Sequence, residues 1–203
     1  LAEAIVSRTE QQDGSDLDNS AGVGSKNAGG NDQMNPFLES QLDLVTLGTV
    51  VDMVPLVGEN RTLTRVGLPI LDRRQRPGIR ALCQVANVDP NRGVNGYTLG
   101  FQLGPRINAA GRMDTAHKVI QLLTTESDDE AKSVAEDLDR LNTERRQQQD
   151  RIEQQAIEQI EEKDLNRMKS LVAAHQDWHP GIIGIVASRI KDKYHRPSFL
   201  LAI

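Results

Sequence analysis

The sequence has little cysteine, few aromatic residues and no long apolar run. Its one cysteine, Cys83, excludes a disulfide scaffold and a cysteine-based structural zinc site. Aromatic residues make up 3% of the chain, but hydrophobic residues reach 37%, which is enough for a core and unlike a disordered acidic tail. No apolar run approaches the ~18–20 residues that a membrane span needs. We therefore expect a cytoplasmic protein without membrane association, with Cys83 as a small core residue.

The length and the two ends indicate part of a larger protein. The chain has 203 residues, enough for one domain or for pieces of two. It begins at Leu1 without an initiator methionine or a signal-peptide pattern. It closes on the apolar run 200–203, which is typical of a strand. We expect an internal fragment.

The net charge of −5 conceals a strong block pattern. Residues 1–58 carry net −7, and residues 59–118, with ten basic and four acidic side chains, carry net +6. Residues 119–164 carry net −8, and residues 165–203 carry net +4. Two basic blocks on either side of an acidic one indicate two surfaces that could meet an anion. Ordinary solvated faces explain the same pattern equally well.

The first half of the chain predicts short helices. Residues 1–8 are typical of a helix end, and residues 9–35, rich in Gly, Ser, Asn and Asp, of a flexible insertion. From Asn35 an apolar pattern predicts one helix that stops near 52–55, because a proline disfavours helix in the residue before it. Further helices are predicted over 59–73, 77–87, 98–103 and 114–124, with Pro77 at a first helical position.

The second half predicts a long helix and then a βαβ unit. Ser127 and Glu130 form a capping-box pattern at the start of a helix over 127–163. Its middle is polar on nearly all sides, which favours a connector between two bodies; a coiled coil is the alternative. A strand over 170–174, a loop over 175–184, a helix over 185–193 and a buried strand over 198–203 then indicate parallel strands.

Asp52 is the first candidate for chemistry. It lies in the apolar stretch LGTVVDMVPL, where an isolated buried carboxylate would cost several kcal/mol. A helix cap or an ion pair would satisfy it. A hard oxygen ligand for Mg²⁺ or Mn²⁺ is the functional interpretation, and such ions activate water for phosphodiester cleavage.

Two further segments suit phosphate. In GPRINAAGR, Arg106 and Arg112 flank the small-residue run 108–111, and guanidinium groups match phosphate oxygens well. An arginine that braces a helix end is the structural alternative. In WHPGIIGIVASRI, glycines before a predicted helix suggest an anion site at its N-terminus, although a histidine before proline is often structural. The candidates there are His179, Gly181, Gly184, Ser188 and Arg189. We assign no function to His117 or His195.

Four segments together resemble one known family. DLVTLGTVVDMVPLVGENRTLTRVGL, RPGIRAL, GFQLGPRINAAGRMDTA and WHPGIIGIVASRI with YHRPSFLLA are similar, in order and spacing, to the bacterial RecJ family of single-stranded-DNA-specific exonucleases, within the DHH phosphoesterase superfamily. The resemblance covers residues 37–203 and 1–8. It implies an α/β protein: the mostly helical C-terminal part of a DHH domain (1–125, with 9–35 inserted), a connecting helix (126–164) and the first βαβ unit of a DHH-associated domain (165–203).

The resemblance also implies an activity and a site. It implies a two-metal, Mn²⁺ or Mg²⁺ enzyme that degrades single-stranded DNA from the 5′ end in recombination and repair. Asp52 matches the family's last metal-ligand aspartate. Arg106, Asn108 and Arg112 match a segment facing the nucleic acid, and the candidates of 179–189 match the associated domain. The chain is expected to be a monomer, with single-strand-binding protein and a helicase as candidate partners.

The departures from the family pattern leave other functions open. The family's Asp-His-His motif does not occur in this sequence, and we expect it and the family's Asp-x-Asp-type metal segment to precede Leu1. We therefore expect the chain alone to be inactive. One alternative is a DHH-type phosphodiesterase for short oligonucleotides or cyclic dinucleotides. The other is a metal-less scaffold that only binds DNA.

Overall fold

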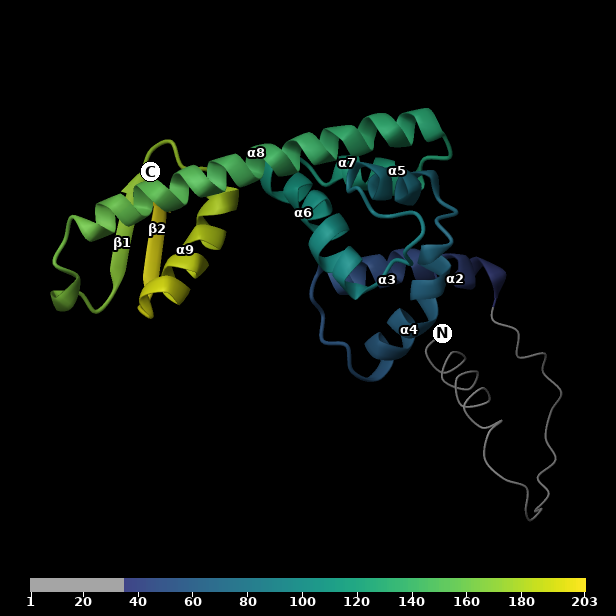
Figure 1. The fold of residues 1–203 in the computed structure, drawn as a ribbon, viewed down its shortest axis with the longest axis horizontal. Coiled ribbons are helices and arrows are strands. Elements are labelled where there is room, and N and C mark those ends of the chain that lie inside the picture. The colour runs from purple at the N-terminus through teal and green to yellow at the C-terminus, as the bar shows by residue number, and fades with distance from the viewer. Residues whose placement is uncertain (1–34) are drawn as a thin grey trace, which may run out of the picture. The chain divides into compact units, whose positions relative to one another are not determined.

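The computed structural model describes residues 35–203. Backbone contacts divide the chain into two compact units, with the boundary between Gly104 and Pro105 (Figure 1). We call them the N-terminal unit and the C-terminal unit. The helix expected over 1–8 and the insertion expected over 9–35 lie outside the described residues, except for Asn35.

Helices are the regular elements of the described part of the N-terminal unit, and turns and loops connect them. Its elements are α2 (Pro36–Ser40), α3 (Leu42–Val51), α4 (Gly58–Asp72), α5 (Pro77–Val85) and the π-helix η2 (Thr98–Leu103). The single helix expected from Asn35 is two helices, because the chain turns at Gln41 between α2 and α3. The expected stop before Pro55 is confirmed, since α3 ends at Val51. Pro77 occupies the first position of α5, as predicted.

Helices α3 and α4 pack closely. Leu42 is fully buried against Leu63, Val66 and Ile70 of α4. At Gly67 a Cβ atom would collide with the carbonyl oxygen of Leu42, so glycine allows the two backbones to approach. Cys83 is buried on α5, which confirms its predicted place in the core, and burial raises the pKa of its thiol.

The C-terminal unit contains the long helix. Its elements are α6 (Gly104–Met113), α7 (His117–Thr124), α8 (Asp128–Glu161), the short η3 (Leu165–Arg167), β1 (Leu171–His175), α9 (Pro180–Tyr194) and β2 (Ser198–Ala202). With 34 residues, α8 is about 50 Å long. Ser127 caps it by accepting a hydrogen bond from the Glu130 N–H at 3.3 Å. The predicted capping box is only half formed, because the Glu130 carboxylate accepts from Gln121 and Thr125 instead.

The βαβ prediction is confirmed. Strands β1 and β2 pair in parallel, with Leu171 opposite Ser198, and α9 connects them. Helix α9 and the C-terminal half of α8 pack on this sheet (Figure 1). The core of this part consists of Ile152, Ala156, Ile160, Leu171, Ala173, Trp178, Ile182, Val186, Ile190 and Leu200.

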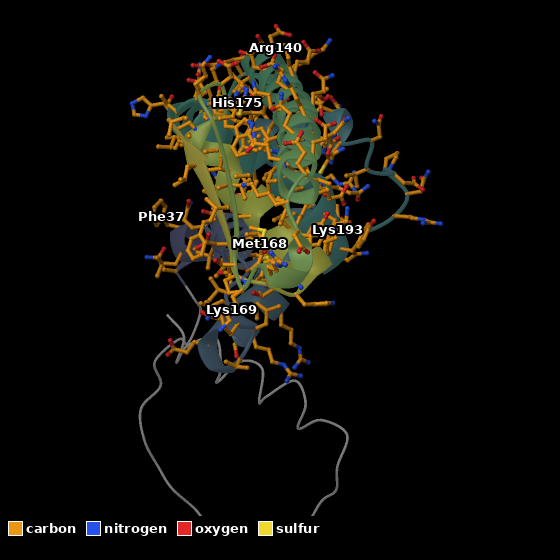
Figure 2. The ribbon with its side chains drawn as sticks, turned by 90° about the vertical axis from the view of Figure 1, so that its left-hand side faces the viewer. Phe37, Arg140, Met168, Lys169, His175 and Lys193 are labelled. Atoms are coloured by element: carbon orange, nitrogen blue, oxygen red, sulfur yellow. The ribbon has the colours of Figure 1, made fainter. Side chains whose placement is uncertain are left out.

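Polar groups reinforce the packing of α8. The Gln159 amide donates to the Ala174 carbonyl and accepts from the Ala174 N–H, both at 3.2 Å, and so pairs with the backbone of β1. On its exposed face Arg140 donates to Asp137 at 2.9 Å and to Glu144 at 3.1 Å (Figure 2). Among residues 35–203, no helix has the length and apolar character required to cross a bilayer.

Candidate nucleic-acid interface

The residues proposed from the sequence fall in three places. Asp52 follows α3 in the N-terminal unit. Arg106, Asn108 and Arg112 lie on α6, and the remaining candidates lie at or in α9, both in the C-terminal unit.

Asp52 is a helix cap at the surface. Its backbone N–H donates to the Gly48 carbonyl at 3.0 Å, and the residue is exposed. Met53 follows in the left-handed region with φ 54°. The expectation that a buried Asp52 carboxylate needs a compensating partner is therefore wrong for this chain, because the helix ends and turns the side chain into solvent.

The buried carboxylate of this region is Asp43. It is 7% exposed and accepts a hydrogen bond from Arg76 Nε at 2.6 Å. The Arg76 Nη2 group also donates to the Ser40 carbonyl at 3.0 Å, which ties the start of α5 to the α2–α3 turn. The sequence carried this signal as well, since Asp43 stands between Leu42 and Leu44 in the apolar pattern that begins at Asn35.

The metal-ligand set is incomplete within the described residues. Residues 35–203 bring no three His, Cys, Asp or Glu side chains together in a group that could hold an ion. A two-metal site needs several carboxylate or imidazole ligands. Asp52 alone does not fit such a site.

Arg106 braces two helices. Its Nε and Nη2 atoms both lie 2.8 Å from Asp139 Oδ1 on α8, and its side chain is 13% exposed. This is the structural alternative raised from the sequence. The contact fixes α6 against α8, with Ala109 and Ala110 of α6 fully buried.

Arg112 and the start of α9 lie together. The exposed Arg112 places its Nη1 atom 3.4 Å from the Gly181 carbonyl oxygen. A Cβ atom on Gly181 would collide with the Arg112 carbonyl oxygen, so the backbones of α6 and α9 are in close contact. The structure thus joins two of the segments proposed for phosphate binding. Asn108 is exposed on the same helix as Arg112.

The loop expected before α9 is shorter than predicted. The helix begins at Pro180, so Gly181 and Gly184 lie inside it rather than before it. Proline is well suited to a first helical position, which explains the early start. His179 is the N-cap: its Nδ1 atom accepts a hydrogen bond from the Gly181 N–H at 3.1 Å. This cap satisfies one of the N–H groups that an anion would use.

Ser188 and Arg189 are exposed beyond the second turn of α9, deeper in the helix than expected. Arg189 Nη1 donates to Glu153 Oε2 at 2.6 Å and lies 3.7 Å from Asp150 Oδ1. Arg189 therefore links α9 to α8, with part of its charge balanced by carboxylates.

Sequence reasoning missed Arg145 on α8. It donates to Gln149 at 2.9 Å and to Asn142 at 3.0 Å, and both partners are 2% exposed. Its Nε atom is buried without a hydrogen-bond partner. The segment RRQQQDR looked like a solvated face, and only the i+4 and i−3 amides hinted at this role.

Three arginines lie near enough to Arg145 for their charges to act on it. Burial is the main cause of its lowered pKa, and the charges of Arg146, Arg112 and Arg189 lower the pKa further, while Asp150 raises it. We call residues 112, 145, 146 and 189 the arginine cluster. It unites α6, α8 and α9, and its planar donors suit phosphate oxygens.

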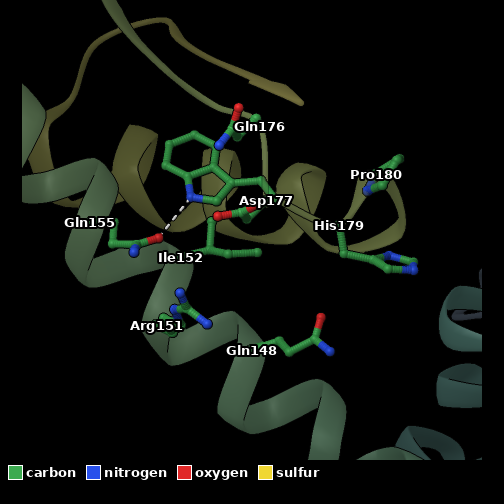
Figure 3. A pocket seen from close by; sticks show the side chains of 9 residues that line it. Gln148, Arg151, Ile152, Gln155, Gln176, Asp177, His179 and Pro180 are labelled. Carbon is green, nitrogen blue, oxygen red and sulfur yellow. Dashed lines mark hydrogen bonds between the residues drawn. The ribbon is translucent and has the colours of Figure 1, made fainter. Parts of the chain in front are cut away.

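A cavity of about 360 Å³ lies between α8 and the start of α9 (Figure 3). Trp178, 3% exposed, donates from Nε1 to Gln155 Oε1 at 2.9 Å in its wall. Gln148, Arg151 and His179 also line it. The lining is part polar and part apolar, and it carries the Asp177 carboxylate as well as the Arg151 guanidinium, which suits a ligand that forms hydrogen bonds.

The known proteins to which this chain is similar carry the same name. The single-stranded-DNA-specific exonuclease RecJ of Bacillus subtilis is 40% identical over 162 residues, which cover 80% of this chain and 20% of the relative. RecJ of Escherichia coli is 42% identical over 171 residues, or 82% of this chain and 30% of the relative. The chain therefore spans between a fifth and a third of these relatives. No protein-family model matches it.

Solved structures that are similar to this chain are also structures of RecJ. A crystal structure of RecJ in complex with Mg²⁺ from Thermus thermophilus is similar with a TM-score of 0.71 at 33% identity, covering 81% of this chain and 25% of that one. A crystal structure of exonuclease RecJ bound to manganese has a TM-score of 0.70 at 33% identity, covering 81% of this chain and 40% of that one.

Proposed function

Because this chain is a segment similar to the RecJ exonuclease family over four-fifths of its length, we propose that the longer protein containing it degrades single-stranded DNA from the 5′ end. The reaction is metal-dependent phosphodiester hydrolysis in DNA recombination and repair. The observation that carries the proposal is the 40% identity to a single-stranded-DNA-specific exonuclease, together with the arginine cluster.

The arginine cluster holds the phosphate backbone in this proposal. Arg112 and Arg146, which are exposed, contact phosphates in this proposal. Arg189 is exposed as well but pairs with Glu153, and Arg145 is held in place by Gln149 and Asn142. Arg106 is a positioning residue, since its pair with Asp139 fixes α6 and thereby Arg112. Contacts to phosphate release counterions, so binding weakens with salt and shows little sequence preference. Asn108, Gly181, Gly184, Ser188 and the N-cap His179 complete the candidate surface.

Asp52 is proposed as one metal ligand of the longer protein. The similar solved structures hold Mg²⁺ or manganese, and either ion suits a carboxylate oxygen. The other ligands come from outside residues 35–203, where no complete set forms. We derive no hydrolytic step from Asp52 alone.

The domain organisation stays a proposal as well. We assign residues 1–125 to the C-terminal part of a DHH domain, 126–164 to a connecting helix and 165–203 to the start of a DHH-associated domain. A monomer in the cytoplasm, with single-strand-binding protein and a helicase as partners, fits this role.

Salt-dependent DNA binding tests the proposal. We expect the 203-residue chain to bind a fluorescein-labelled oligothymidylate, measured by anisotropy between 50 and 200 mM salt. Arg112→Gln and Arg146→Gln should each weaken binding and reduce the salt slope by about 1. Arg140→Gln is the matched control, because Arg140 is an exposed arginine of α8 that pairs with Asp137 and Glu144. An equal loss in the control, or salt-independent binding, would contradict the proposal.

Substrate length separates the proposal from its nearest alternative. In the longer protein we expect faster hydrolysis of a long single strand than of a dinucleotide. Faster dinucleotide hydrolysis would favour a phosphodiesterase for short oligonucleotides or cyclic dinucleotides. The absence of any hydrolysis would favour a metal-less scaffold that only binds DNA.

A further inference from the structure

The N-terminal unit exposes a stacked pair of aromatic rings. Tyr97 and Phe101 have ring centroids 5.0 Å apart and an interplanar angle of 26°. They are 66% and 67% exposed in a chain that has few aromatic residues. Exposing two large rings side by side keeps apolar surface in water, which is unfavourable unless a ligand covers it.

The local backbone holds this pair in place. Tyr97 directly precedes η2, and Phe101 lies within it, one turn later. Leu99 and Leu103 of η2 are fully buried and anchor the turn. The Asn95 side chain accepts from the Thr98 N–H at 3.0 Å and from the Thr98 hydroxyl at 3.3 Å, which caps the turn that presents Tyr97. Isolated π-helical turns occur frequently at functional sites.

A cavity of about 270 Å³ with a mixed polar and apolar lining is lined in part by Tyr97. Besides Tyr97, the polar residues that line it include Asn87, Asp89, Arg92, Asn95 and Gln102. Arg92 has a side chain that is 88% exposed and lies 3.8 Å from the Asp89 carboxylate. Arg74 Nη2 donates to the Arg92 carbonyl at 3.1 Å, so the loop is tied to the end of α4.

We propose that Tyr97, backed by Phe101, is a stacking platform for one base of single-stranded DNA. An aromatic face, amide groups at its edge and a guanidinium group are the combination that binds unstacked bases and their phosphates. Protein docking would favour an apolar rim, whereas this rim carries amides and Arg92. The inference rests on the proposed function, but it concerns a surface of the N-terminal unit, whereas the arginine cluster belongs to the C-terminal unit.

Stacking has a direct optical test. A single-stranded oligonucleotide carrying 2-aminopurine loses fluorescence when that base stacks on an aromatic ring. We expect the 203-residue chain to quench one such oligonucleotide and not its duplex. Tyr97→Leu and Phe101→Leu keep apolar bulk but remove the π-face, so the quenching should disappear and the dissociation constant should rise roughly 5- to 150-fold.

Phe37→Leu is the matched control. Phe37, on α2, is also 67% exposed but has no stacked partner among the ring contacts found in residues 35–203 (Figure 2). Its substitution should leave quenching and affinity unchanged. Arg92→Gln should weaken binding while the quenching at saturation persists, because it removes a phosphate contact and not the platform.

The outcomes separate this inference from the proposed function. Binding without quenching, or quenching that survives Tyr97→Leu, would overturn the platform and leave the proposed function intact. No binding to any single strand would overturn both. A Tyr97-dependent dimer in analytical ultracentrifugation, with no effect on DNA, would assign the pair to a second copy of the chain and also overturn the inference.

Discussion

At the scale of single residues, the sequence pattern does not show which charged side chains are buried and paired. Asp43 and Asp52 both have apolar neighbours in the sequence, yet Asp43 is 7% exposed and paired, whereas Asp52 is an exposed cap. Arg145 shows the same effect, since two buried amides hold its guanidinium in place. Such residues stabilise the surfaces on which the proposed ligands of this chain would bind.

The Asp43–Arg76 pair gives the prediction at this scale. Arg76→Ala leaves the buried Asp43 carboxylate without its 2.6 Å donor, so we expect a loss of about 2–3 kcal/mol in the free energy of unfolding. Urea denaturation followed by circular dichroism measures it. Arg61→Ala is the control: Arg61 is exposed on α4, and its removal should cost less than about 0.5 kcal/mol. Equal losses would show that the pair contributes little.

At the scale of elements, the contact between α6 and α9 matters most. Two segments with the small residues expected of a phosphate site turn out to pack on each other through Gly181 and Arg112. The two glycines of α9, Gly181 and Gly184, therefore do not serve the same structural purpose. Gly181 makes room for the Arg112 carbonyl, whereas a Cβ atom on Gly184 would meet open space.

This difference predicts opposite effects of two similar substitutions. Gly184→Ala should stabilise the chain by about 0.5–1 kcal/mol, because alanine favours helix over glycine. Gly181→Ala should destabilise it by about 1–3 kcal/mol, because the added methyl group forces α6 and α9 apart. Urea denaturation of both variants checks the signs. Stabilisation by Gly181→Ala would mean that the α6–α9 contact is loose.

At the scale of the whole molecule, residues 35–203 carry the two surfaces proposed for a nucleic acid but no group of side chains that could hold a metal ion. The basic blocks of the sequence correspond to Arg92 beside the Tyr97 cavity and to part of the arginine cluster. No group of three metal-ligating side chains forms within residues 35–203. Binding and cleavage should therefore be separable.

We expect the 203-residue chain to bind a labelled single strand with the same affinity in Mn²⁺ and in EDTA, and to leave it uncut. Denaturing electrophoresis after incubation with Mn²⁺ measures cleavage. In the longer protein, Asp52→Ala should abolish cleavage and spare binding. Metal-dependent trimming by the 203-residue chain, or cleavage by the longer protein with Asp52→Ala, would contradict this division.

Much of the fold follows from local sequence. Apolar periodicity, Pro77 at a helix start, Ser127 at a cap and Pro55 after a helix all act over a few residues, and those predictions hold. The parallel strands followed from two apolar runs joined by a helix. The helix starts at Gln41–Leu42 and Pro180 were missed, since several boundaries there were compatible with the same pattern.

The sequence by itself determined the family resemblance, most of the helical elements and the candidate residues, because these depend on residue order and short-range preferences. Helix α6 lies between two expected helices and was not predicted. Only the tertiary structure decided which charges are buried and which segments meet. It placed Arg106 on Asp139, Arg112 beside Gly181 and three other arginines around Arg145. These contacts join residues distant in sequence, and their energies depend on burial, which no local pattern specifies.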